Sequence, residues 1–198
     1  MQLESTFLIM KRLPNGILQH NNANKAIDMG KNLNIHKLLA DGERVTLECK
    51  KATKGIPNSL WDTYSAFANT SGGIILLGIV EHIEEKDITK RFDIVGVEDA
   101  DKIRKDLWNI ANSREKVSIN LLHDEDVETI TLDDKKIIAI NVPRADYTIR
   151  PIYINNNLLK GTFKRNHEGD YHCTEQEIKM MLRDANEAGN DGVLLEYY

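Results

Sequence analysis

The sequence predicts an α+β domain in which helices flank a mixed β-sheet. Stretches with apolar residues at helical spacing are interspersed with stretches that alternate with a period of two. The segment GIILLGIV (73–80) is apolar on both faces, as expected of a central strand. Several later segments follow one another across short polar turns, which is typical of antiparallel hairpins. With 198 residues, 41% of them hydrophobic, the chain is large enough to bury such a core.

The domain itself is expected at residues 34–189. Residues 1–33 are rich in turn formers and show little periodicity, so we interpret them as an N-terminal arm, and residues 190–198 as a C-terminal tail. Asn34 can cap a short first helix with an apolar face at Ile35, Leu38 and Leu39.

A strand, a helix and a buried strand follow. RVTLECK (44–50) alternates, with one face formed by Val45, Leu47 and Cys49. Pro57 suits the first turn of the next helix, in which apolar residues recur at helical spacing. Gly72 and Gly73 should end that helix. The buried strand that follows should end on the acidic residue Glu81.

The second half of the domain contains one helix and a series of strands. Asp99 can cap a helix that runs to Asn112. Strands are predicted at FDIVGV (92–97), VSINLL (117–122), VETITL (127–132), KKIIAINVP (135–143), RPIYI (150–154) and LLKGTFKR (158–165). Polar turns at Asp133-Asp134 and at 155–157 should join the last four of these strands into two pairs.

The last helix has a capping box. Thr174 and Glu177 have the spacing in which each side chain bonds the other residue's backbone N–H. An apolar face follows at Ile178, Met181 and Leu182. Gly189 is expected to end this helix.

Composition limits the classes of function. The net charge of −5 argues against a protein that coats nucleic acid by bulk electrostatics, although it allows a local basic patch. Cys49 and Cys173 are isolated and are interpreted as free thiols in a reducing compartment. The N-terminus does not resemble a signal peptide, and the longest apolar run is too short to span a bilayer. We therefore expect a cytoplasmic protein with no membrane partner.

The glycines do not form a phosphate-binding motif. A phosphate loop needs Lys and then Ser or Thr after its last glycine, whereas Gly78 is followed by Ile79 and Val80. The dinucleotide fingerprint also fails, because these glycines lie between a helix and a strand in the reverse order. This chain therefore carries no ATPase motif.

Three carboxylates are candidates for a catalytic or metal-binding cluster. Glu43 and Glu48 flank the first strand, and Glu81 ends the buried strand. If the strands are neighbours, Glu48 and Glu81 could approach each other and bind Mg²⁺ or Mn²⁺, as a metal-dependent nuclease requires. A five-residue step places Glu43 and Glu48 on opposite faces unless the chain bends before Val45. The alternative is that these are solvated acids at strand ends.

Basic residues cluster twice, with aromatic residues interleaved in the second cluster. Cations that contact phosphate and aromatic faces that stack on bases suit single-stranded or loop nucleic acid. The alternative is a solvated strand edge protected by lysine. The candidate nucleic-acid-binding residues are Lys50, Lys51, Lys54, Arg150, Lys160, Lys164 and Arg165. His167, His172 and Cys173 lack a fourth ligand at zinc spacing.

The segment LLADGERVTLECKKATKGIPNSLWDTYSAFANTSGGIILLGIVE (38–81) resembles the Schlafen AlbA-like domain. The features that carry the resemblance are an acid followed by E-C-K at 43–50, then AFANTSGG, then a strand ending in G-I-V-E. The later segments VPRADYTIRPIYI and GTFKRNHEGDYHCTEQEIKMML are similar to the closing half of this family. There Arg165 matches the arginine of a Y-x-R strand. The resemblance covers about residues 38–184.

The resemblance implies a DNA-binding module with its basic face on nucleic acid. Bacterial members are described as transcriptional regulators, as ATP-binding or as RecG-helicase-related. Their ATP site generally belongs to a separate C-terminal ATPase-like region, so ATP would bind only through a region absent from this chain. By this resemblance the chain would be the N-terminal portion of a longer protein. Binding would require no cofactor, and the choice between DNA and RNA stays open.

Animal relatives imply an alternative function, metal-dependent endoribonuclease activity. Their site contains two glutamates five residues apart and a third acid, which correspond to Glu43, Glu48 and Glu81 as catalytic and metal ligands. The family usually has Asp at the position of Glu81, and many members carry another acid at the position of Val80. Because the animal enzymes clamp RNA with a duplicated domain, a single copy would need to form a homodimer.

Overall fold

The computed structural model describes residues 35–41, 45–85, 87 and 90–194. Its helices are α1 (Ile35–Asp41), α2 (Ser59–Asn69), α3 (Ala100–Ala111) and α4 (Glu175–Leu194). The strands are β1 (Leu47–Lys50), β2 (Gly73–Leu77), β3 (Ile79–Glu81), β4 (Phe92–Ile94), β5 (Val127–Leu132), β6 (Lys135–Val142), β7 (Phe163–Asn166) and β8 (Gly169–His172). Two 3-10 turns are η1 (Asp124–Asp126) and η2 (Tyr147–Ile149). This is the predicted α+β class.

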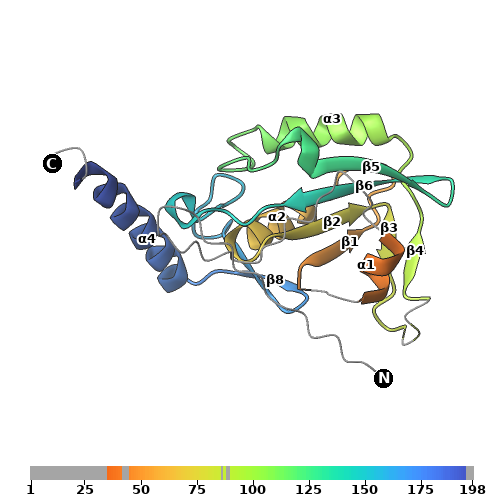
Figure 1. Ribbon diagram of the computed structural model, residues 1–198, viewed down its shortest axis with the longest axis horizontal. Coiled ribbons are helices and arrows are strands. Elements are labelled where there is room, and N and C mark those ends of the chain that lie inside the picture. Colours follow the sequence, from red (N-terminus) through yellow and green to blue (C-terminus); the bar gives the residue numbers. More distant parts are fainter. Residues whose placement is uncertain (1–34, 42–44, 86, 88–89, 195–198) are drawn as a thin grey trace, which may run out of the picture.

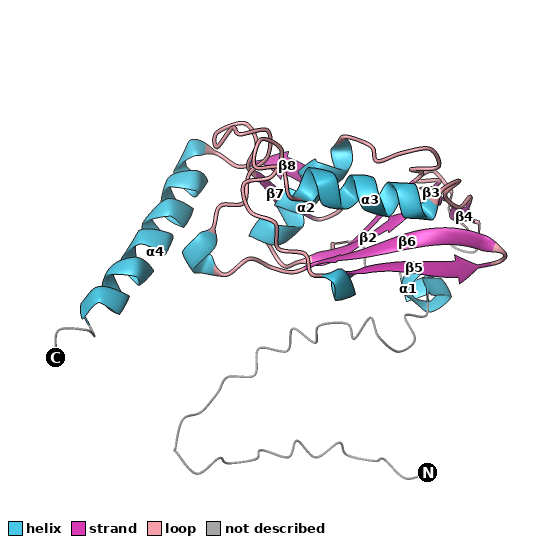
Figure 2. Cartoon of the chain, turned by 90° about the horizontal axis from the view of Figure 1, so that it is seen from above, coloured by secondary structure: helices cyan, strands magenta, loops and turns pink. Residues whose placement is uncertain are grey.

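The main sheet is mixed and has the strand order β1-β2-β6-β5. β1 pairs parallel to β2, whereas β6 runs antiparallel to both β2 and β5. Helices α2 and α3 lie on one face of this sheet and α1 lies on the other, while α4 projects from one end (Figures 1 and 2). The sheet is therefore covered on both faces, which explains the apolar sequence of its central strand.

The core has two parts because β2 contributes side chains to both faces of the sheet. Ile75 and Leu77 pack with α2 and α3 in the larger part, which contains Tyr64 and Phe67. Ile74 and Leu76 face α1 in the smaller part, with Ile35, Leu39 and Leu47. All four of these β2 side chains are at most 2% exposed.

The predicted central strand 73–80 is interrupted at Gly78. The backbone there has φ +93°, and a Cβ would lie 3.0 Å from the backbone of Gly96, so only glycine suits the position. The chain leaves the main sheet at this glycine, and β3 pairs with β4 in a separate two-stranded sheet. The prediction that Glu81 ends the central strand is therefore wrong, since Glu81 ends β3.

Residues 117–122 do not form the predicted strand. Val117 makes only an isolated bridge to Ile154. The Tyr64 hydroxyl accepts a hydrogen bond from the Leu121 N–H at 2.7 Å and donates one to the Ile119 carbonyl at 3.2 Å. A buried side chain thus uses the backbone groups that a neighbouring strand would have bonded.

The predicted pairing of 150–154 with 158–165 is reduced to one bridge, between Tyr153 and Thr162. Instead, β7 pairs with β8 across a tight turn in which His167 has φ +52°. The last helix also differs from prediction, because α4 continues through Gly189 to Leu194. A single glycine inside a helix costs only about 1 kcal/mol, which is too little to end it.

Other local predictions are confirmed. The Asp99 side chain caps α3 by accepting from the Lys102 N–H at 2.9 Å. Asp133 and Asp134 both have positive φ in the turn between β5 and β6. The capping box of α4 forms, with the Thr174 N–H donating to the Glu177 carboxylate at 2.8 Å. Asn34, expected to cap α1, lies outside the described residues.

A buried polar network joins α2 to the closing half of the domain. The Asn69 side-chain amide donates to the carbonyls of Ile152 at 2.8 Å and Phe163 at 3.0 Å, and its oxygen accepts from the Ile152 N–H at 2.8 Å. The Ser65 hydroxyl accepts from the Phe163 N–H at 3.0 Å and donates to the Ile152 carbonyl at 2.8 Å. Ser65 and Asn69 of the SAFANTSGG motif therefore have a structural role.

We predict that Asn69→Ala lowers the free energy of unfolding by about 3 kcal/mol, because it leaves buried backbone groups of Ile152 and Phe163 without partners. Urea denaturation followed by circular dichroism measures this change. Asn109→Ala, on the exposed face of α3, is the matched control and should change stability by less than about 0.5 kcal/mol. Equal stability of the two variants would contradict the structural role of Asn69.

Candidate nucleic-acid interface and carboxylate pocket

The guanidinium of Arg165, on β7, lies at the centre of a charged network. Its side chain is only 2% exposed. It donates to Glu48 Oε2 at 3.0 Å and to Asp170 Oδ1 at 2.9 Å. It also donates to the carbonyls of Val45 and Leu47, each at 3.2 Å. Its carbon Cζ lies 5.1 Å from the centre of the Phe67 ring. This cation is therefore fully engaged inside the protein.

Glu48 lies between two cations. Besides Arg165, its carboxylate accepts from Lys50 Nζ at 3.0 Å, and Lys50 extends to the Ser59 hydroxyl at 3.4 Å. On the other side of the network, Asp170 accepts from the Thr63 hydroxyl at 2.6 Å. The network thus connects β1, α2 and the β7–β8 hairpin through neutralised charges.

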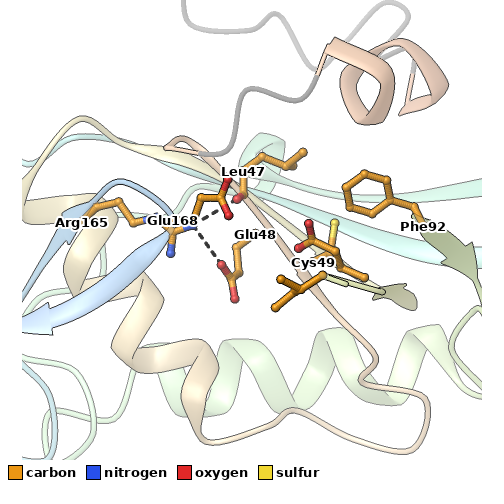
Figure 3. Close-up of a pocket in the computed structure, with 8 residues that line it drawn as sticks. Leu47, Glu48, Cys49, Phe92, Arg165 and Glu168 are labelled. Carbon is orange, nitrogen blue, oxygen red and sulfur yellow. Dashed lines mark hydrogen bonds and ion pairs between the residues drawn. The ribbon is translucent and has the colours of Figure 1, made fainter. Parts of the chain in front are cut away.

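A pocket of about 110 Å³ opens beside this network (Figure 3). Its lining consists of Leu47, Glu48, Cys49, Glu81, Ile83, Phe92, Arg165 and Glu168. Burial, followed by the charges of Glu81 and Glu48, raises the pKa of the Cys49 thiol to about 12. The Cys49 thiol is therefore protonated at neutral pH, so it lines the pocket without acting as a nucleophile.

The structure brings together two of the three predicted carboxylates. Glu48 and Glu81 line the same pocket, and Glu81 accepts a hydrogen bond from Arg91 Nε at 2.9 Å. Glu43 lies outside the described residues. Within the described ranges, no three His, Cys, Asp or Glu side chains are arranged to hold a metal ion. The described residues alone do not fit a metal site, so a site made of the three predicted carboxylates depends on Glu43.

The seven predicted cations divide into engaged and exposed groups. Lys50 and Arg165 belong to the internal network, and Lys164 pairs with Glu177. Lys164 and then the Thr174 N–H lower the pKa of the Glu177 carboxyl to about 2. The cations on the outside are Lys51, Lys54 and Lys160, and Arg150 is partly exposed.

Some residues of the site were not found from the sequence. Glu168 enters the pocket from the turn between β7 and β8, and Asp170 is the register partner of Arg165 in that hairpin. The sequence NHEG (166–169) could have indicated this turn. No sequence pattern around Arg91 indicates that it pairs with Glu81.

Comparison with known proteins identifies the family. The family profile described as Schlafen, AlbA_2 matches residues 43–174. The chain belongs to this family. The match includes Glu48, Glu81 and Arg165, and therefore covers the pocket.

Two solved structures are similar to this chain, and the first of them supports the α+β fold described above. One is the N-terminal domain of an ATP-dependent DNA helicase RecG-related protein from Nitrosomonas europaea, with 27% identity and a TM-score of 0.50, covering 71% of this chain and 90% of that chain. Another is the DIP2311 protein from Corynebacterium diphtheriae, with 20% identity and a TM-score of 0.46, covering 75% of this chain but 27% of that chain. No curated protein matches this sequence. None of the helices in the described ranges combines the length and apolarity that crossing a bilayer requires.

We predict that Arg165→Met lowers the free energy of unfolding by about 3 kcal/mol, because it removes the partner of two largely buried carboxylates. Chemical denaturation measures the loss. Arg114→Met, at an exposed position, is the control. Glu48→Gln should cost less stability in the Arg165→Met background than in the wild type, since the two residues interact directly. Additive effects of the two substitutions would argue against this coupling.

Proposed function

We propose that this chain is a nucleic-acid-binding domain, and specifically a DNA-binding module of a cytoplasmic transcriptional regulator. The observation that carries the proposal is the likeness to the N-terminal domain of the RecG-related protein, at 27% identity over 90% of that chain. The name of that protein relates it to a DNA helicase. An N-terminal domain of such a protein is well placed to bind the DNA on which the rest of the protein would act.

The distribution of charge supports this proposal. Within the described part of the chain, the side chains of Lys51, Arg144 and Lys160 are exposed and make no ion pair. Cations that are not neutralised by neighbouring carboxylates can release counterions from a phosphate backbone. A net charge of −5 does not prevent this, because attraction of a phosphate depends on the local charge around the exposed cations and not on the sum over the whole chain.

We predict that the domain binds a fluorescein-labelled DNA with an affinity that falls steeply with salt. Lys51→Gln and Lys160→Gln should each lower the affinity and reduce the salt slope by about one unit, as expected for the loss of one phosphate contact. Fluorescence anisotropy between 50 and about 200 mM salt measures both quantities. Lys102→Gln, an exposed lysine on α3, is the control. A wild-type protein that binds neither DNA nor RNA at low salt would refute the function.

A second candidate is metal-dependent endoribonuclease activity. The observation that favours it is a single pocket lined by three carboxylates, Glu48, Glu81 and Glu168. Against it, Glu48 is already paired with Arg165 and Lys50, so a metal ion would have to compete with two cations. Glu43 would be required as a further ligand.

We predict that any cleavage of tRNA by this chain requires Mn²⁺ or Mg²⁺ and is abolished by Glu81→Gln and by Glu43→Gln. Gel electrophoresis of tRNA with metal or with chelator measures cleavage, and light scattering in the same buffer reports whether the protein is a homodimer. Glu115→Gln, at an exposed position outside the pocket, is the control. Cleavage that survives both substitutions would exclude these carboxylates, and intact tRNA with Mn²⁺ would exclude the activity.

A further inference from the structure

The turn that ends α2 is packed against the segment that carries Arg144 and Arg150. The Ala145 N–H donates to the Ala68 carbonyl at 2.8 Å, and Arg150 Nη1 donates to the Asn69 carbonyl at 3.4 Å. A Cβ on Gly72 would lie 3.0 Å from the Arg144 nitrogen. The end of AFANTSGG therefore positions the backbone next to Arg144 and the side chain of Arg150.

Arg144 and Arg150 both lie at the turn that ends α2, Arg144 through its backbone nitrogen and Arg150 through its side chain. Burial, followed by the nearby charge of Arg144, lowers the pKa of Arg150. Arg144 is exposed, and within the described residues its side chain makes no hydrogen bond or ion pair. The buried Nε of Arg150 has no partner among those residues either. Two guanidinium groups that repel each other favour an anion bound between them.

The acids near this pair are engaged elsewhere. The Asp146 carboxylate accepts from both the N–H and the hydroxyl of Thr148, at 2.9 and 2.6 Å. Asp184 pairs with Arg183 at 3.1 Å. These two carboxylates influence Arg150 through space but do not form an ion pair with it. The two carboxylates reduce the local positive potential, but they leave N–H groups of the arginines available to an external anion.

An exposed aromatic side chain lies between the two arginines in sequence. Tyr147 begins η2, three residues from each arginine, and it is 50% exposed. A half-exposed ring on the same short segment as two arginines is a combination that can bind a phosphate and stack on an unpaired base. A base inside a duplex is not available for such stacking.

We propose that Arg144, Tyr147 and Arg150 form a binding subsite for single-stranded nucleic acid, in which the arginines hold a backbone phosphate and Tyr147 stacks on the adjacent base. This inference rests on the proposed nucleic-acid-binding function and assigns it a strand type and a location. The subsite lies at the turn that ends α2, at the opposite end of β6 from the β5–β6 turn.

The test compares a labelled single-stranded 12-mer with the duplex of the same sequence, by fluorescence anisotropy at several salt concentrations. Arg144→Gln should weaken binding of the single strand about tenfold at low salt and reduce the salt slope by about one unit. Tyr147→Ala should weaken it about tenfold without changing the slope, whereas Tyr147→Phe should bind like the wild type. Arg150→Lys, which keeps the charge of a partly buried residue, should weaken binding less than Arg144→Gln.

The charge control is Lys136→Gln. Lys136 is exposed near the start of β6, and Arg144 follows the end of that strand, roughly 25 Å away at the usual rise per residue. Wild-type binding that is unaffected by Arg144→Gln and Tyr147→Ala would overturn the subsite while leaving the proposed function intact. Equal loss of duplex and single-strand affinity in Tyr147→Ala would overturn the stacking role. Absence of wild-type binding would refute both proposals.

Discussion

The buried guanidinium of Arg165 is the constraint on which the rest of this domain depends. A cation with 2% exposure needs hydrogen-bond acceptors for its N–H groups. These acceptors are the carbonyls of Val45 and Leu47, the Glu48 carboxylate on β1 and the Asp170 carboxylate on β8. Because the acceptors lie on different elements, satisfying one charge positions the hairpin against the sheet edge. The pocket lies beside this arrangement, and Arg165 holds one of its carboxylates, Glu48, in position.

The basic residues of this domain fall into two groups, those paired with carboxylates of the protein and those exposed on its surface. Arg165, Lys50 and Lys164 neutralise carboxylates of the protein itself, whereas Lys51, Arg144 and Lys160 are exposed and have no ion-pair partner among the described residues. A count of basic residues along the chain cannot distinguish these groups. The proposed binding surface is therefore defined by the cations that are not paired inside the protein. The net charge of the chain does not predict where that surface lies.

Sequence patterns predicted what depends on neighbouring residues. The presence of the four helices, the Asp99 cap and the Asp133-Asp134 turn follow from local chemistry and are confirmed, although α4 continues beyond its predicted end. The break at Gly78 was missed because an unbroken apolar run gives no sign of where a strand changes sheets. The ion pair between Glu48 and Arg165 joins residues 117 positions apart, and no local pattern encodes such a contact. The β7–β8 hairpin was missed because His167 occupies a position where glycine or asparagine is usual.

The polar network around Ser65 and Asn69 has a consequence for synthesis of the chain. Its hydrogen bonds join residues that are 83 to 98 positions apart. During translation at about 5–20 residues per second, α2 would emerge roughly 5–20 s before the backbone that satisfies it. Until then, Ser65 and Asn69 lack their hydrogen-bond partners, and the apolar face of α2 is not yet covered by the rest of the core. The nascent domain should therefore close late and in one step, and a ribosome pause between α3 and β7 would prolong exposure of its most apolar helix face.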